Sequence, residues 1–325
     1  MRTAVAILST AVTRRGPEGF RSAPERAPWS TPPPSAMASS RCRSPSSAAG
    51  RRCRLPEAFV PGYPAWVWRL KPGGDWGLSE QIHQRLLENA VNLERNHLDR
   101  VCEAGAEAGV TVVMGINERD GSIGRTTLYN SAVVIGGDGE ILNHHRKLMP
   151  TNPKRMIWGF GDGAGLRAID TPVGRIGVLL CWENYMPLAR FALYAQGIDI
   201  HIAPTYDSGE AWTGTLQHIA REGGCWVIGA GVALRNQDLP DDFPERDRLY
   251  PPHEDWINPG DSVVIAPGGG KNCWPPAPTT EDPVCRDRSR PCSHRPPHLR
   301  RDRPLCPPRR LHPPRQPATA ITHRV

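Results

Sequence analysis

Cys181 stands where an apolar strand meets a following helix, in the segment RIGVLLCWENYMPLAR at residues 175–190. A thiol at such a junction faces a cleft and lies near the positive end of the helix, and both conditions favour the thiolate, which is the nucleophile. The alternative is a small buried hydrophobic residue, because free Cys is among the most buried residue types. The sequence therefore offers Cys181 as a candidate for covalent catalysis.

Two further residues would complete such chemistry. Lys147 stands between a strand end and a Pro-rich loop in HHRKLMPT, and Glu57 stands among Pro, Gly and aromatic residues in LPEAFVPGYP. Taken singly, Lys147 could be a solvated surface charge and Glu57 could be structural. Together with Cys181 they supply a nucleophile, a carboxylate base and a cation near developing negative charge. That combination is typical of covalent hydrolysis.

The elements that must position these residues lie within 55–270, where strands and helices alternate. Apolar spacing predicts helices over 79–108, with a break near Asn96, over 187–196 and over 212–222. Strands are predicted at 110–116, 128–136, 140–147, 166–171, 175–180, 198–204, 225–234 and 262–267. Turns at 137–139 and 172–174 predict antiparallel pairs. The pattern indicates a layered α/β fold with a mixed sheet.

Both ends of the chain differ from this middle part. Residues 1–54 and 271–325 hold 20 of the 35 Pro and carry a net charge of +8 each, against −9 for the residues between them. We expect both ends to be disordered, because they cannot bury enough apolar area to offset the entropy of ordering. The pI of about 9.1 therefore describes the ends. An acidic middle argues against nucleic acid or a membrane surface as a partner.

Cysteine usage indicates a cellular compartment, and hydropathy indicates whether a membrane helix is present. The six Cys of the two ends show no paired spacing typical of a zinc site. The middle holds only Cys102, Cys181 and Cys225, which suits a reducing compartment, and we expect a cytoplasmic location. No run approaches the roughly 20 apolar residues that a membrane helix needs.

Several motifs together resemble one known family. LPEAFVPGYP, HRKLMPT, IWGFGDG and LLCWENYMPLAR follow one another in the order found in the nitrilase superfamily, and HIAREGGCWVIGAG and DSVVIAPGG come after them. The resemblance covers about residues 55–270. The Cys-Trp-Glu sequence is similar to the nitrilase branch rather than to the amidase or carbamoylase branches.

The resemblance implies a four-layer α-β-β-α sandwich. It places Glu57 on the general base, Lys147 on the catalytic lysine and Cys181 on the nucleophile. The implied reaction converts an organic nitrile to a carboxylic acid and ammonia through a thioimidate and an acyl-thioester, with no metal or cofactor. Hydrolysis of cyanide or of an amide by the same residues is a related alternative. Family members commonly form homo-oligomers, and aromatic residues such as Tyr63, Trp158 and Trp182 would bind the substrate.

Three departures from the family give a second hypothesis. Lys154 stands where the family carries a further active-site glutamate, and a second cation there could depress the pKa of Lys147, misplace it or close the site. Residues 1–54 offer only a weak first strand over 3–8, and no buried strand is expected before Leu55. The match stops near Gly270. On this hypothesis the chain is a catalytically impaired product of a damaged or frameshifted nitrilase gene. The alternative explanation of the two ends is a natural disordered extension at each of them.

Overall fold

The computed structural model describes residues 5–7, 52–121 and 126–272. The expectations for residues 8–51 and 273–325, including their disorder, lie outside these ranges. No helix in the described ranges is long and apolar enough to cross a bilayer.

Two sheets form the centre of the described chain. The first has the strand order β1-β2-β3-β4-β5 and the second the order β13-β12-β9-β8-β7-β6. The first sheet consists of β1 (Val5–Ile7), β2 (Arg52–Val60), β3 (Thr111–Arg119), β4 (Leu128–Ile135) and β5 (Ile141–Arg146). The second consists of β6 (Ile169–Thr171), β7 (Gly174–Val178), β8 (Ile200–Thr205), β9 (Trp226–Gly231), β12 (Val263–Ile265) and β13 (Lys271–Asn272). Both sheets are mixed, as predicted: β7, β8 and β9 run parallel, whereas β3-β4-β5 and β6-β7 are antiparallel.

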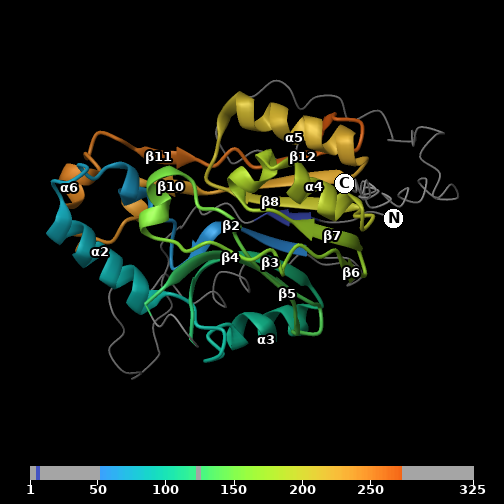
Figure 1. The fold of residues 1–325 in the computed structure, drawn as a ribbon, viewed down its shortest axis with the longest axis horizontal. Helices are drawn as coiled ribbons and strands as arrows, with labels where there is room; N and C mark the ends of the chain where they lie inside the picture. The colour runs from blue at the N-terminus through green and yellow to red at the C-terminus, as the bar shows by residue number, and fades with distance from the viewer. Residues whose placement is uncertain (1–4, 8–51, 122–125, 273–325) are drawn as a thin grey trace, which may run out of the picture. The chain divides into compact units, whose positions relative to one another are not determined.

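Apolar side chains between the sheets and outside them produce four layers. Val113 and Val134 of the first sheet share one buried cluster with Ile202 and Ile228 of the second, so the two sheets pack face to face. The outer face of the first sheet packs on α3 (Asp99–Ala108), and that of the second packs on α4 (Pro187–Tyr194) and α5 (Gly209–Gly223). Figure 1 shows this order: α3, the two sheets, then α4 and α5. The fold is the predicted α-β-β-α sandwich.

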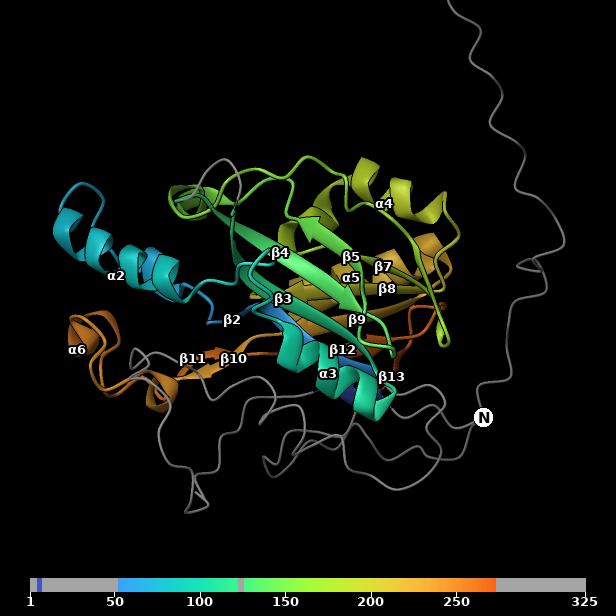
Figure 2. The same cartoon turned by 90° about the horizontal axis from the view of Figure 1, so that it is seen from below.

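Smaller elements gather at one end of the sandwich. They are the 3₁₀ helix η1 (Ala65–Trp68), α2 (Trp76–Asn89), α6 (Arg246–Leu249) and the hairpin of β10 (Ala233–Arg235) with β11 (Trp256–Pro259). Buried residues of these elements, such as Ile82 and Leu249, form a separate cluster that also includes Tyr250 and Trp158. Figure 2 shows α2 and α6 next to each other beyond the ends of the strands.

Most predicted elements are present, with two differences. The break predicted near Asn96 is confirmed: α2 and α3 lie on either side of it, and Asn96 has a left-handed φ of 58°. The predicted strand over 225–234 divides into β9 and β10, because β10 leaves the sheet to pair with β11. The weak strand expected over 3–8 is present as β1, but no buried strand was expected directly before Leu55, and β2 begins at Arg52. Its backbone pairs in parallel with β3 and with β1, and both pairings satisfy hydrogen-bonding groups whatever the side chains are.

Candidate active site

Glu57 lies on β2, at an irregularity in the pairing of β2 with β3 between Leu55 and Val60. Its carboxylate is completely buried. One oxygen accepts hydrogen bonds from Lys147 Nζ and from Asn130 Nδ2, both at 2.7 Å. The other oxygen accepts the backbone N–H of Tyr206 at 2.9 Å. Burial alone would raise the pKa of Glu57, but the charges of Lys147 and Lys154 and these hydrogen bonds hold it below its usual value.

Lys147 directly follows β5 and is 1% exposed. Its backbone N–H donates to Asn130 O at 2.8 Å, so the same residue of β4 holds the main chain of Lys147 and the carboxylate of Glu57. Burial would lower the pKa of Lys147, but the charge of Glu57 and the hydrogen bond to it raise that pKa above its usual value. Lys147 is therefore a cation. Of the three effects considered for Lys154, a depressed pKa of Lys147 is not the one found.

Cys181 begins the 3₁₀ helix η3 (Cys181–Tyr185), three residues after β7. It is 2% exposed, and its backbone has a left-handed φ of 50°. A non-glycine residue in that region stores about 1–3 kcal/mol of strain, and such residues cluster at functional sites. The charges of Glu57, Lys147 and Lys154 all influence the pKa of Cys181, so the three residues lie near it.

The thiol differs from the sequence-based expectation in one respect. A lowered pKa was predicted, but burial and the charge of Glu57 raise the pKa of Cys181, and the opposing charges of Lys147 and Lys154 do not compensate. The helix that follows is a single 3₁₀ turn, and α4 begins only at Pro187. The helix-end effect that would favour the thiolate falls off within one turn. The resting nucleophile is therefore a neutral thiol beside a carboxylate.

Glu183 connects the two segments that carry Lys147 and Cys181. Its carboxylate accepts the backbone N–H of Leu180 at 2.6 Å and that of Leu148 at 2.7 Å. His145 Nε2 lies 3.0 Å from both of its oxygens. Leu148 is adjacent to Lys147 and Leu180 to Cys181, so one buried carboxylate fixes the backbone on both sides of the site. No local signature in the sequence predicts this role of Glu183.

Asn117 and Gly115 of β3 shape the segment around Glu57. Asn117 Nδ2 donates to Gly62 O at 2.9 Å, which holds the loop after Glu57. A Cβ at Gly115 would lie 2.7 Å from Ala58 N and 2.8 Å from Glu57 Cα, so only glycine allows this approach. Asn117 and Asn130 interrupt otherwise apolar strands, so the sequence marks them as unusual. The sequence does not show which groups they bind.

The three predicted substrate-binding aromatics lie in two places. Tyr63 and Trp158 are buried together, with ring centroids 6.0 Å apart in an edge-to-face arrangement, and Trp158 Nε1 donates to Asn117 Oδ1 at 3.0 Å. Tyr63 also stacks on Tyr206 at 3.9 Å, next to Glu57. Trp182 is 48% exposed and contacts Tyr185 on the surface, so it does not join the other two.

Lys154 lies in the 3₁₀ helix η2 (Asn152–Met156) and is 3% exposed. Its ammonium lies 5.6 Å from the ring centroid of Tyr63 and 5.8 Å from that of Trp68. Its charge lowers the pKa values of Glu57 and Cys181. Lys154 therefore faces the candidate site, as the sequence analysis considered.

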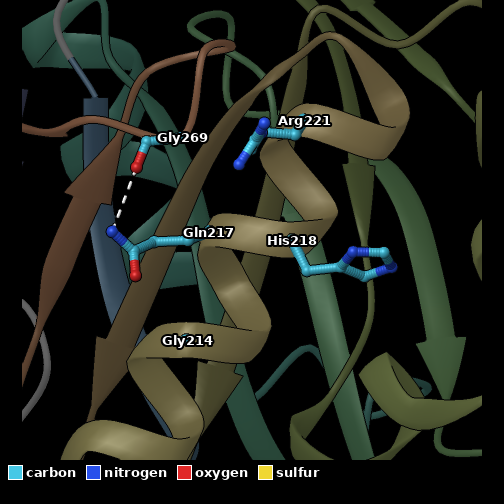
Figure 3. A pocket seen from close by; sticks show the side chains of 5 residues that line it. All are labelled: Gly214, Gln217, His218, Arg221 and Gly269. Atoms are coloured by element: carbon cyan, nitrogen blue, oxygen red, sulfur yellow. Dashed lines mark hydrogen bonds between the residues drawn. The ribbon is translucent and has the colours of Figure 1, made fainter.

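A pocket of about 350 Å³ lies elsewhere, on the outer side of α5 (Figure 3). It is lined by Gly214, Gln217, His218, Arg221 and Gly269. None of Glu57, Lys147 and Cys181 contributes to it. Within the described ranges, no group of three or more His, Cys, Asp and Glu side chains is placed to hold a metal ion.

The buried triad and its sandwich fold agree with what the chain matches among known proteins. The sequence profile of the family described as carbon-nitrogen hydrolase matches residues 53–269. The chain belongs to the carbon-nitrogen hydrolase family. An amidase from Nesterenkonia sp. has a similar fold, with a TM-score of 0.50 and 18% identity over 73% of this chain and 74% of that chain.

Relatives within this carbon-nitrogen hydrolase family are nitrilases. A bifunctional nitrilase/nitrile hydratase of Lupinus angustifolius is 39% identical over 228 residues, which are 66% of this chain and 61% of the relative. Nitrilase 2 of Arabidopsis thaliana is 37% identical over 66% of this chain and 63% of its own length. An aliphatic nitrilase of Sinorhizobium fredii is 37% identical over 66% and 68%. The chain thus spans about three fifths of the length of the two plant relatives.

Proposed function

We propose that this carbon-nitrogen hydrolase converts an organic nitrile to a carboxylic acid and ammonia, with Cys181 as nucleophile. The observation that carries the proposal is the buried Glu57–Lys147 pair, joined at 2.7 Å, with the Cys181 thiol under the influence of both charges. Similarity to curated nitrilases at about 38% identity supports a nitrile rather than another carbon-nitrogen substrate.

The first step needs a base, because the raised pKa of Cys181 keeps its thiol protonated. Glu57 takes that proton while the sulfur forms a bond to the nitrile carbon. One C–N bond of the triple bond opens, and the nitrogen accepts the proton to give a neutral thioimidate. The Lys147 ammonium stabilises the negative charge that develops during this attack.

Two water molecules complete the reaction. The first, deprotonated by Glu57, adds to the thioimidate carbon; the nitrogen takes up protons, the C–N bond breaks and ammonia leaves. The remaining acyl-thioester is attacked by the second water, again with Glu57 as base. The C–S bond breaks, the acid departs and Cys181 regains its proton. Tyr63, stacked on Tyr206 next to Glu57, and Trp158, packed against Tyr63, would form an apolar wall for the substrate. Trp182 would meet the substrate only nearer the surface.

The test is ammonia release from a panel of aliphatic and aromatic nitriles by the purified chain. Cys181→Ala should abolish release. Cys102→Ala is the matched control, because Cys102 is a partly exposed thiol of α3, outside the two sheets, and should leave release unchanged. Release that survives in Cys181→Ala would contradict the proposed nucleophile. The corresponding amides, run alongside, separate nitrile from amide hydrolysis.

We further propose that the chain forms a homo-oligomer in the cytoplasm. Exposed apolar side chains gather on η3 and α4: Trp182, Tyr185, Leu188 and Phe191. Trp182 and Tyr185 contact each other, and a group of exposed apolar side chains on neighbouring elements is typical of an interface. Sedimentation of the parent chain beside Leu188→Glu tests this proposal: the variant should sediment as a smaller species, and an unchanged coefficient would count against α4 as the contact.

A further inference from the structure

Among the described residues, no carboxylate forms an ion pair with the buried residue Lys154. Only 3% of the residue is exposed. Among the described residues its side chain forms no ion pair and no hydrogen bond; its contacts are the rings of Tyr63 and Trp68. An aromatic face attracts a cation but does not neutralise it. A charge removed from water in this way is unfavourable unless an anion pairs with it.

The neighbouring carboxylate does not fill this role. Both oxygens of Glu57 are occupied by Lys147, by Asn130 and by the backbone N–H of Tyr206. The two buried lysines therefore differ. Lys147 is neutralised by Glu57 at 2.7 Å, whereas Lys154 lies near the same carboxylate without pairing with it.

The two rings near the Lys154 ammonium differ in exposure. The ring of Trp68 is about half exposed, whereas that of Tyr63 is buried. The ring of Tyr63 stacks on that of Tyr206, and Tyr206 donates its backbone N–H to Glu57. A molecule that reaches Glu57 and Cys181 along these rings would meet the Lys154 charge.

We propose that Lys154 is a specificity-determining residue that pairs with a carboxylate of the substrate. Resting on the proposed function, this defines the substrate class as short aliphatic nitriles that bear a carboxylate. The nitrile carbon would lie at the Cys181 sulfur and the carboxylate at the Lys154 ammonium, in a charge-assisted hydrogen bond of about 2.7–2.9 Å. A neutral nitrile of the same length would leave the buried cation unpaired.

The experiment compares ω-cyanocarboxylates of increasing length with neutral nitriles of matched length in the full chain. The readout is the ratio of kcat/KM for the anionic substrate to that for its neutral match. Any effect of a variant on Glu57 or Cys181 changes both values and cancels in the ratio. Lys154→Met should lower the ratio at least tenfold, Lys154→Arg should keep it, and Lys71→Met, which removes an exposed lysine, is the matched control.

A binding measurement keeps the inference separate from the proposed function. In Cys181→Ala, calorimetry should show tighter binding of the cyanocarboxylate than of its neutral match, and Lys154→Met added to that variant should remove the difference. Equal ratios in parent and Lys154→Met, or no such difference in binding, would overturn the inference. If the parent chain releases no ammonia from any nitrile but binds the cyanocarboxylate, the proposed function alone is contradicted. If the parent is inactive and Lys154→Glu restores ammonia release, the inference is overturned and the impaired-enzyme hypothesis is supported.

Discussion

Glu183→Gln tests whether one carboxylate holds the two halves of the site together. The carboxylate accepts hydrogen bonds from the backbone N–H groups of Leu180 and Leu148 and contacts His145, and it is completely buried. The amide retains one acceptor oxygen and turns an N–H₂ group toward the other donor. At least one hydrogen bond to a charged group is lost, and a buried backbone N–H loses its partner. We expect a loss of about 2–4 kcal/mol in the free energy of unfolding.

Urea denaturation followed by circular dichroism measures that loss. Glu88→Gln is the matched control, because this exposed carboxylate of α2 contacts only Gln84 among the described residues, and it should change stability by less than about 0.5 kcal/mol. Glu183→Gln should also lower kcat at temperatures where it stays folded, because the backbone beside Lys147 and Cys181 is released. A midpoint within error of the parent would refute the argument.

Three other perturbations have defined outcomes. Lys147→Met leaves the buried Glu57 charge without its cation and should destabilise the chain by roughly 3–5 kcal/mol; adding Glu57→Gln should restore stability in denaturation but not ammonia release. Hydrogen bonds from His144 and Arg146 outweigh burial and lower the pKa of Glu118 to about 2. The contribution of Glu118 to the free energy of unfolding is therefore complete above pH ~4.5 and is lost as the pH falls toward 2. The free energy of unfolding of Glu118→Gln should thus change less with pH over that range than that of the parent. Gly115→Ala forces a methyl group against the backbone of Glu57 and should cost about 1–3 kcal/mol in thermal unfolding.

The sequence was informative wherever local pattern decides the structure. Apolar runs located most strands of both sheets, although not β2 or β13. The turns predicted at 137–139 and 172–174 join the antiparallel pairs β4-β5 and β6-β7. Glu57 lies within β2, Lys147 directly follows β5 and Cys181 follows β7, and these segments of the two packed sheets bring the three residues together.

What the sequence did not show depends on distant partners. Asn130 lies 73 residues from Glu57 along the chain, and Glu183 lies 35 residues from Leu148, so neither contact has a local signature. The raised pKa of Cys181 follows from complete burial beside Glu57, which a strand-helix junction does not reveal. Trp182 was grouped with Tyr63 on residue type alone, and its half-exposed position depends on how η3 packs.

Covalent capture at Cys181 tests the central claim most directly. The parent chain, quenched with acid during turnover of a nitrile, should yield a nitrile-derived adduct on the peptide that contains Cys181, and the adduct should vanish once the substrate is consumed. Peptides that contain Cys102 and Cys225 serve as references in the same digest, and both should be unmodified. Continued ammonia release with no adduct on Cys181, or with an adduct on either reference cysteine instead, would contradict the account.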